Sequence, residues 1–459
     1  MTVEILAVGG YNEVGKNMTA IKINSGQSED VLIFDAGLYL PPVVEIQEAE
    51  KMDVANGGRQ SIPDEKRMRT IGAIPDDYLL DKLQWRGKVR AMAIGHAHLD
   101  HVGAVQYMAQ RYNAEVVGTP YTIEVLKRLM SDNQGMIQNP LRTINPNSSY
   151  YMKGQKNYQI EFLNMTHSTP QTAIMVLHTP EGAIVYANDY KLDNTPTFGS
   201  PPNYEALRRV AKKGVKALII DSLYAGSERK TPSERIARDL LEEVMLTVNN
   251  RNQGIIVSTF SSHIARLKSI VEFSKKLNRE VIFVGRSLKK YVDASISSNI
   301  CTFSKDIRMA SYKKQVESYL KRASKNKAEC VVVCTGHQGE PGSILERMSR
   351  GQLPYTFGSD VNIIFSSSTI PVPVNVANKE KMDKRLRKEK VRIFDDVHVS
   401  GHGGREDARD LIKLLNPEHV IPSHGEMAKT LPMLELAKEL GYKVGKTCHL
   451  MENGKRVVL

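Results

Sequence analysis

Three histidines and one aspartate occur within six positions of this chain, between His96 and His101. They follow the apolar run Ala91–Ile94, which predicts a short buried strand, so the cluster falls where that strand would end in a loop. Imidazole and carboxylate groups pack poorly in an apolar core, but they are ligands that zinc accepts. A solvated histidine-rich turn is the alternative. The spacing H-x-H-x-D-H directly after a strand favours neighbouring metal ions instead.

This motif resembles the signature of the metallo-β-lactamase fold. The resemblance implies an αββα sandwich, in which two sheets lie between helical layers. It also implies an early aspartate and three later ligands, each placed after an apolar, strand-like run. The chain has such residues in the expected order, namely Asp35, His167, Asp189 and His424.

A gap of domain size precedes the last of these residues. His167 and Asp189 are 22 positions apart, whereas Asp189 and His424 are 235 positions apart. A metal-dependent hydrolase of one domain would not need so long a separation. We therefore expect an inserted domain between the last strands of the metal domain.

Strand and helix patterns alternate within this gap, which favours a mainly parallel sheet with helices on its faces. A capping box at Thr231–Glu234, with Pro232 at the first helical position, predicts the start of one helix. Apolar residues at helical spacing between Ile264 and Phe273 predict another. The predicted strands are Ile255–Ser258, Val281–Val284, Cys330–Cys334 and Asn362–Phe365.

The predicted domain boundaries follow from this pattern. Residues 1–225 form the first part of the metal domain, 226–380 the insert, and 381–459 the return to the metal domain. The segment Asn378–Lys390 is dense in lysine and arginine and is interpreted as a solvated connection, with a contact to RNA as the alternative. Residues 41–70 lack periodicity and predict a long surface loop, which suits a dimer contact or a path for RNA.

An α/β insert at this place resembles the β-CASP subgroup of the fold, whose members cut nucleic acids. Two further residues match the motifs of that subgroup. Asp221 follows the strand-like run Ala217–Ile220, and His402 lies among small residues, 22 positions before His424.

Within the β-CASP subgroup the sequence is most similar to the ribonuclease J family, over nearly the whole chain. The matching blocks are Gly9–Met18, Thr335–Pro341, Ser366–Pro371 and His398–His402. The chain stops 35 residues after His424, so we expect it to lack the extra C-terminal domain of the bacterial members. In this respect it resembles the archaeal form of the family.

The resemblance implies a hydrolytic site with two zinc ions, or with manganese in their place. The implied ligands are His96, His98 and His167 for one ion, Asp100, His101 and His424 for the second, and Asp189 for both. Asp100 would also orient the attacking water. Asp35 and Asp221 would accept hydrogen bonds from ligand imidazoles. His402 would contact the phosphate and protonate the leaving oxygen.

The activity implied by the resemblance is that of a 5′→3′ exoribonuclease of RNA decay and maturation. It would act on single-stranded RNA with a preference for a 5′-monophosphate end. Ser366, Ser367, Ser368 and His398 are the candidates for a pocket that binds this phosphate, together with His402, and the glycine-rich segment Gly336–Gly342 would lie nearby. A simple turn is the alternative interpretation of the three serines.

Three other functions compete with this one. An RNA-processing endonuclease would use the same metal site, but no additional RNA-binding domain is expected before Met1. A small-molecule hydrolase is disfavoured by the insert, by His402 and by the basic charge. An inactive RNA-binding scaffold is disfavoured because every ligand position is filled.

Composition agrees with an RNA partner. Lysine and arginine exceed aspartate and glutamate by 12, and a basic surplus favours polyanions. No apolar run approaches the roughly 20 residues that span a bilayer, and the N-terminus lacks a signal-peptide pattern. The cysteines 301, 330, 334 and 448 are few and scattered, so we expect them to be reduced in a cytoplasmic protein. The family resemblance adds the expectation of a homodimer.

Overall fold

The computed structural model describes residues 2–26, 28–46, 64–132, 137–370 and 373–459. Apolar runs near the amino end of the chain form the centre of a seven-stranded sheet. Its order is β19-β1-β2-β3-β4-β5-β6, antiparallel from β19 to β3 and parallel from β3 to β6. The strands are β1 (Thr2–Gly9), β2 (Met18–Asn24), β3 (Glu29–Phe34), β4 (Val89–Ile94), β5 (Glu115–Gly118), β6 (Leu141–Thr143) and β19 (Arg456–Val458).

A second sheet of six strands has the order β18-β11-β10-β9-β8-β7. The pairs from β7 to β10 are antiparallel, whereas β11 is parallel to both β10 and β18. The late strand β18 therefore joins a sheet built from much earlier residues. The strands are β7 (Ser148–Met152), β8 (Tyr158–Asn164), β9 (Ala173–Thr179), β10 (Gly182–Ala187), β11 (Val215–Asp221) and β18 (His419–Ser423).

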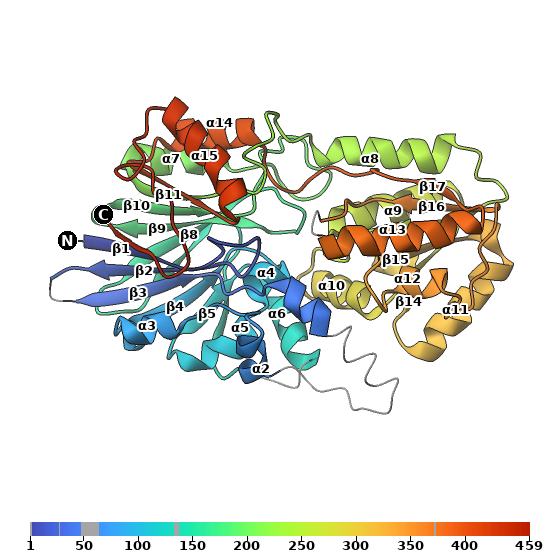
Figure 1. Cartoon of the computed structure of the whole chain (residues 1–459), viewed down its shortest axis with the longest axis horizontal. Coiled ribbons are helices and arrows are strands. Elements are labelled where there is room, and N and C mark those ends of the chain that lie inside the picture. Colours follow the sequence, from blue (N-terminus) through green and yellow to red (C-terminus); the bar gives the residue numbers. More distant parts are fainter. Residues whose placement is uncertain (1, 27, 47–63, 133–136, 371–372) are drawn as a thin grey trace. The chain divides into compact units, whose positions relative to one another are not determined.

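These two sheets pack face to face, with helices on their outer sides (Figure 1). Between the sheets, the rings of Phe34 and Tyr186 stack with their centroids 5.0 Å apart, within a buried cluster drawn from both sheets. A second cluster joins the outer face of the six-stranded sheet to α7, α14 and α15 through residues such as Leu207, Leu411 and Leu436. This is the expected αββα sandwich.

Among the other helices of this sandwich, α2 to α5 are short, whereas α6 is longer and packs beside β5 and β6. The helices are α2 (Glu65–Thr70), α3 (Tyr78–Lys82), α4 (Leu99–Val102), α5 (Val105–Met108), α6 (Pro120–Asp132), α7 (Tyr204–Lys213), α14 (Arg405–Leu415) and α15 (Met427–Glu439).

The third sheet is parallel throughout and has the order β14-β13-β15-β12-β16-β17. It belongs to a separate compact unit, the second unit, formed by Thr195–Phe198 and Pro232–Ser400; the sandwich is the first unit. The strands are β12 (Gly254–Ser258), β13 (Glu280–Val284), β14 (Ile307–Ala310), β15 (Cys330–Cys334), β16 (Val361–Phe365) and β17 (Arg392–Phe394).

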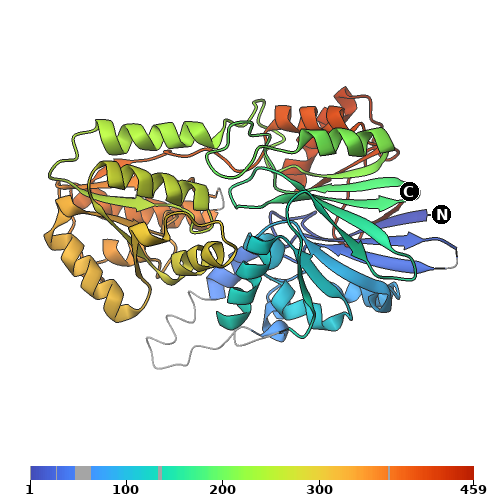
Figure 2. The same ribbon diagram turned by 180° about the vertical axis from the view of Figure 1, so that it is seen from behind.

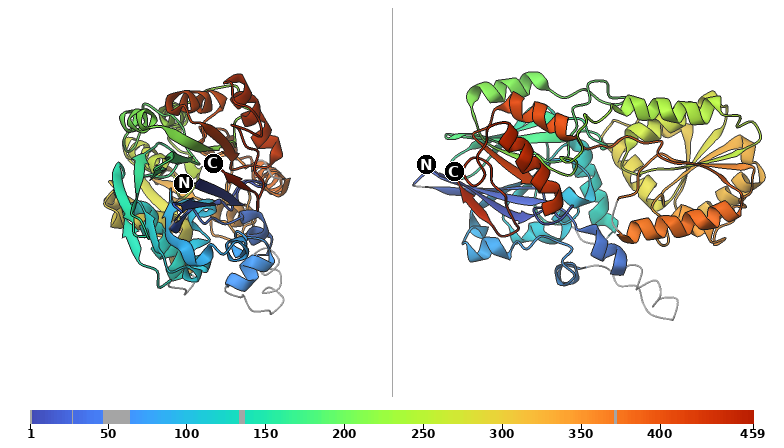
Figure 3. Two further views of the ribbon diagram at one scale, coloured as in Figure 1. Left: turned by 90° about the vertical axis from the view of Figure 1, so that its left-hand side faces the viewer. Right: turned by 45° about the horizontal axis from the view of Figure 1, so that its top comes forward.

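Helices cover both faces of this parallel sheet, as the views in Figures 2 and 3 show. The chain moves from β12 to β14 in one direction and returns through β15 and β16 to β17 in the other. Right-handed crossovers therefore place α9 and α10 on one face and α11 to α13 on the other. The helices are α8 (Glu234–Glu242), α9 (Ile264–Lys276), α10 (Arg286–Ser297), α11 (Lys313–Lys325), α12 (Ile344–Ser349) and α13 (Pro373–Lys388).

The insert extends further along the chain than the predicted boundary at residue 380. The segment Asn378–Lys390 is not a solvated connection, because most of it belongs to α13, and Met382 and Leu386 are fully buried in the core under this helix. The strand β17, which sequence analysis missed, then adds the edge of the parallel sheet. The second unit accordingly runs from Pro232 to Ser400.

Two further predictions were wrong in detail. The helix at the start of the insert begins at Glu234, with Ser233 as its cap, because Thr231 instead donates a hydrogen bond to the carbonyl of His402. Residues 41–70 are not one loop: a helix covers 40–46 and α2 covers Glu65–Thr70, while 47–63 lie outside the described residues.

The four cysteines are free, as expected. Among the described residues, no helix combines the length and apolar character needed to cross a membrane.

Candidate metal centre

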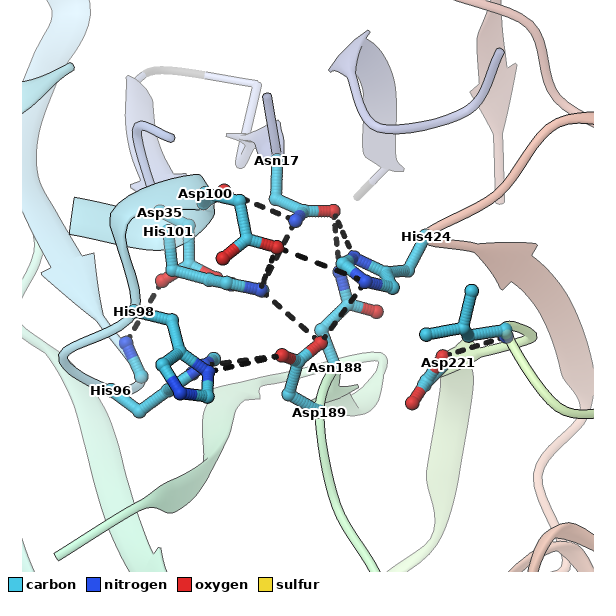
Figure 4. Close-up of polar contacts among 12 residues, drawn as sticks. Asn17, Asp35, His96, His98, Asp100, His101, Asn188, Asp189, Asp221 and His424 are labelled. Atoms are coloured by element: carbon cyan, nitrogen blue, oxygen red, sulfur yellow. Dashed lines mark hydrogen bonds and ion pairs between the residues drawn. The ribbon is translucent and has the colours of Figure 1, made fainter. Parts of the chain in front are cut away.

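The candidate site lies in the first unit, where strands of both sheets end. Asp35 follows β3, His96 lies two residues after β4, Asp189 two residues after β10, and His424 follows β18 directly. The backbone at Asp35, Asp189 and His424 is left-handed, with φ of 59°, 55° and 59°. Such a conformation costs a non-glycine residue about 1–3 kcal/mol, and it is concentrated at functional sites. Sharp turns after the strands thus aim these side chains at one another (Figure 4).

One group of ligand atoms centres on His98. Its Nδ1 atom lies 3.1 Å from Nε2 of His96 and 3.0 Å from Nε2 of His167. Oδ2 of Asp189 lies 3.2 Å from Nε2 of His96 and 3.4 Å from Nε2 of His167. Three imidazoles and one carboxylate thereby converge from separate segments of the chain.

A second group shares the same aspartate. Oδ1 of Asp189 lies 3.2 Å from Nε2 of His101 and 3.6 Å from Nε2 of His424. Oδ2 of Asp100 lies 3.6 Å and 3.8 Å from these two nitrogens. Asp189 therefore presents one oxygen to each group, as Figure 4 shows for the ligands that it labels.

These groups fit divalent metal ions. Oδ1 of Asp189 is buried and accepts no hydrogen bond from the described residues, a costly state for a carboxylate unless a cation lies beside it. Burial lowers the pKa of His96 to about 4, so its ring is neutral at pH 7 and offers a nitrogen lone pair. Burial also lowers the pKa of His101, but Asp189, Asp100 and Asp35 outweigh it and raise that pKa, a sign of the negative charge gathered here. Nitrogen and carboxylate donors in this ratio suit zinc.

Hydrogen-bond partners outside the two ligand groups fix the orientation of the imidazoles of His101 and His167. Nδ1 of His101 lies 2.7 Å from Oδ2 of Asp35, whose other oxygen accepts a hydrogen bond from the amide of Gly95 at 2.9 Å. Nδ1 of His167 donates to the carbonyl of Gly401 at 2.7 Å. With Nδ1 engaged in this way, Nε2 is the nitrogen that each ring turns toward the centre. Asp35 thus has the contact that was expected of it.

His424 is oriented by an asparagine to which sequence analysis gave no role. Oδ1 of Asn17 accepts a hydrogen bond from Nδ1 of His424 at 2.9 Å, and its amide nitrogen donates to the carbonyl of Asp100 at 3.1 Å. Asn17 belongs to the block Gly9–Met18 that carried the family resemblance, which was the only available signal. No sequence signal pointed to the carbonyl of Gly401, because every residue has a backbone carbonyl.

Asp221 and His402 form a pair beside the two groups. Oδ2 of Asp221 accepts a hydrogen bond from Nδ1 of His402 at 2.8 Å, so its partner is His402 and not a ligand imidazole as expected. Nε2 of His402 lies 3.9 Å from Oδ2 of Asp189. Burial opposes the charged form of His402, but Asp189 and Asp221 outweigh it and raise the pKa of His402 to about 9.

The serines proposed for a phosphate pocket lie in the second unit, at the end of β16, and differ from one another. The hydroxyl of Ser366 is fully buried; it accepts a hydrogen bond from Arg266 at 2.7 Å and donates one to the carbonyl of Val397 at 2.9 Å. Ser367 is also buried, whereas Ser368 is half-buried. Ser366 therefore has its hydrogen-bonding capacity used within the fold.

His398 belongs to the same unit and follows Val397. Its Nδ1 atom is buried and has no hydrogen-bond partner among the described residues. Burial, with Arg266 adding to the effect, lowers the pKa of His398 to about 2, so the ring is neutral. His402, the remaining pocket candidate, lies in the first unit.

Comparison with known proteins agrees with this fold and site. Residues 252–384 match the family described as "Ribonuclease J, beta-CASP domain", and 389–449 match "Zn-dependent metallo-hydrolase RNA specificity domain". The chain is 40% identical to Ribonuclease J of Methanocaldococcus jannaschii, over 99% of this chain and 98% of that protein. It is also 40% identical to Ribonuclease J of Pyrococcus abyssi, over 98% and 96%.

More distant relatives extend the comparison. Ribonuclease J 1 of Streptococcus pyogenes is 27% identical, over 100% of this chain and 74% of that protein. A solved structure of a protein of unknown function from Enterococcus faecalis has a TM-score of 0.66 at 15% identity and covers both chains fully, a likeness of fold.

The sandwich, the inserted parallel sheet and the gathered His/Asp ligands define a metallo-hydrolase with a β-CASP domain. Within that class, the chain belongs to the ribonuclease J family of metal-dependent ribonucleases.

Proposed function

We propose that the protein is a 5′→3′ exoribonuclease that acts on single-stranded RNA and prefers a 5′-monophosphate end, in RNA decay and maturation. The proposal that the protein hydrolyses RNA rests on the two groups of candidate metal ligands that share Asp189. Two zinc ions bound there, or manganese in their place, would supply a nucleophilic water at neutral pH and neutralise charge on the phosphate. The direction of degradation and the preference for the 5′ end come from the family resemblance. The same resemblance brings a homodimer into the proposal, and the few, scattered cysteines bring a cytoplasmic location.

The residues of the chain divide the work of hydrolysis. The three imidazoles of His96, His98 and His167 hold one side of the site, while Asp100 orients the attacking water on the other. Asp221 holds His402 through Nδ1, which leaves Nε2 directed toward Asp189. From there, Nε2 of His402 donates its proton to the oxygen that leaves the phosphorus, so the departing nucleotide carries a hydroxyl.

Replacing His402 by alanine should keep the bound metal but reduce RNA hydrolysis by about a hundredfold or more, because a general acid contributes about 10²–10⁴-fold. The check is the metal content by mass spectrometry beside the initial rate on one RNA. His178→Ala is the matched control, since His178 pairs with Glu161 away from the ligand groups. Loss of metal in the His402 variant would show that it is a ligand and would refute its assigned role.

We further propose that Ser366, Ser367, Ser368 and His398 form the site for the 5′ phosphate. The four residues lie in one unit, at the carboxyl end of β16 and in the segment after β17, where ligands of open parallel sheets bind. Within this group, the half-buried Ser368 and the ring of His398 are the groups that donate to the phosphate. Ser366 shapes the turn, since its hydroxyl is bound by Arg266 and Val397.

The pocket is tested by the rates on one RNA with either a 5′-monophosphate or a 5′-hydroxyl end. Ser368→Ala and His398→Ala should each lower the ratio of these rates about tenfold, because a hydrogen bond to a charged group contributes about 1.5–3 kcal/mol. Ser318→Ala, at an exposed position of α11, is the control. An unchanged ratio in both variants would exclude this pocket while leaving the hydrolytic site intact.

A further inference from the structure

The positive charge of this protein is concentrated in one of its two units. Of the 63 lysine and arginine residues and 51 acidic residues in the chain, the segment Pro232–Ser400 contains 29 and 18. That segment has a net charge of +11, whereas the rest of the chain, with 34 basic and 33 acidic residues, has +1. The metal ligands all lie in the nearly neutral part. The basic surplus therefore needs an explanation other than the hydrolytic site.

Helix α13 carries part of this surplus, with six basic and two acidic residues. Its buried side is formed by Met382 and Leu386, and its solvent side presents Lys381, Lys384 and Lys388 at helical spacing. None of these three lysines forms an ion pair with a described residue, in contrast to Lys379 and Arg385 of the same helix, which pair with Asp383 and Glu346. The exposed charge of α13 is thus not neutralised within the fold.

Helix α11 adds a second basic row on the same face of the sheet. Val316, Leu320 and Ala323 bury its inner side in the core cluster that also contains the buried residues of α12 and α13. Its exposed lysines are Lys313, Lys314, Lys321 and Lys325. At the start of α11, Tyr312 is 67% exposed and offers an aromatic ring beside this charge. Figure 1 shows α11, α12 and α13 in orange as one helical layer.

We propose that this basic face, formed by the exposed lysines of α11 and α13 and by Tyr312, binds the sugar–phosphate backbone of single-stranded RNA outside the hydrolytic site. Lysine is a point charge on a flexible stem, which suits phosphates in any sequence context. An exposed tyrosine beside lysines suits stacking with an unpaired base. The solvent side of α13 between Lys381 and Lys388 has no exposed large apolar residue that could enter a lipid surface. The inference rests on RNA being the substrate of the proposed function, but not on the direction of degradation.

The test compares two triple variants of the full-length protein. Lys381, Lys384 and Lys388 are changed to glutamine in one, and Lys212, Lys213 and Lys438, three exposed lysines of the first unit, in the other. Binding of a long phosphorothioate-linked RNA, which resists hydrolysis, is measured by fluorescence anisotropy over a range of salt. The α13 variant should bind at least about tenfold more weakly, with a salt slope shallower by about two, because single strands lose about 0.7 per neutralised phosphate. The control variant should keep the wild-type slope.

Hydrolysis distinguishes this face from the site itself. The α13 variant should raise KM for a long RNA and leave the turnover of a pentanucleotide unchanged, since a short substrate has few phosphates to offer a second binding surface. An unchanged salt slope, or an equal loss in both triple variants, would overturn the proposal. Loss of binding to vesicles of phosphatidylserine without loss of RNA binding would assign the face to a lipid surface and overturn it as well. If the protein proves to be an endonuclease, the binding result still decides this proposal.

Discussion

Replacing Asp189 by alanine should remove metal from both ligand groups and reduce RNA hydrolysis by about a thousandfold or more. Asp189 directs one carboxylate oxygen to each ligand group. The alanine variant therefore takes one candidate ligand atom and a negative charge away from both groups. Metal ions contribute several kcal/mol of charge stabilisation to phosphate chemistry, and about 4 kcal/mol corresponds to a thousandfold in rate. Metal content by mass spectrometry and the initial rate on one RNA measure the two effects.

Two variants make this result specific. Asp189→Asn keeps the shape of the side chain but not its charge, and it should behave like the alanine variant. Asp76→Ala removes an exposed carboxylate of the first unit and should leave both the metal content and the rate unchanged. If the Asp189 variants retained two metal ions per chain, the shared-ligand assignment would be wrong.

Replacing Arg266 by methionine should destabilise the second unit by about 3–5 kcal/mol, the usual cost of removing one partner of a buried ion pair. Arg266 is fully buried, with Nε and Nη2 donating to the two carboxylate oxygens of Glu234 at 2.7 and 2.9 Å. Its Nη1 donates to the carbonyl of Val397 at 3.1 Å and to both oxygens of Ser366. The variant takes both guanidinium hydrogen bonds from the buried Glu234 carboxylate and leaves it with the ring of His263 at 3.5 Å.

A double variant separates the ion pair from the other contacts. Changing Glu234 to leucine together with Arg266→Met removes the buried carboxylate as well and should recover part of the loss. The carbonyls of Ser366 and Val397 lose the donor on Arg266 but keep the hydroxyls of Thr259 and Ser366 as donors. Lys275→Ala, in the exposed pair with Asp306, should cost less than about 1 kcal/mol. Hydrogen exchange of the β16 and α9 amides reports the second unit, while fluorescence of Trp85, the only tryptophan, reports the first. A loss below about 1 kcal/mol for Arg266→Met would contradict this account.

Sequence analysis predicted those parts of the fold and site in which the residue types and their spacing are explained by a single structure. A strand followed by H-x-H-x-D-H, and later aspartates and histidines after apolar runs, located the side chains that the structure brings together around Asp189. The predicted strands of the insert were also confirmed, because Ile255–Ser258 and Cys330–Cys334 are continuous apolar runs of a buried parallel sheet.

The missed features have physical causes. In α13, lysine and arginine outnumber the apolar residues. The helix was therefore missed, although Met382 and Leu386 have the spacing of a buried helical side. The carbonyl of Gly401, which orients His167, is a backbone group present at every residue. Arg266 gave no signal because burial of an arginine depends on where Glu234 and Val397 arrive in the fold. Tertiary contacts determine these three features, and local patterns do not encode them.

The most direct test of the proposed function is a degradation time course on one unstructured RNA, labelled at either end and carrying a monophosphate, triphosphate or hydroxyl group at its 5′ end. The account predicts that 5′-labelled RNA releases mononucleotides at once, while 3′-labelled RNA shortens progressively, fastest from the monophosphate end. Discrete internal fragments whose rate ignores the 5′ group would contradict it, and would show an endonuclease built on the same metal site.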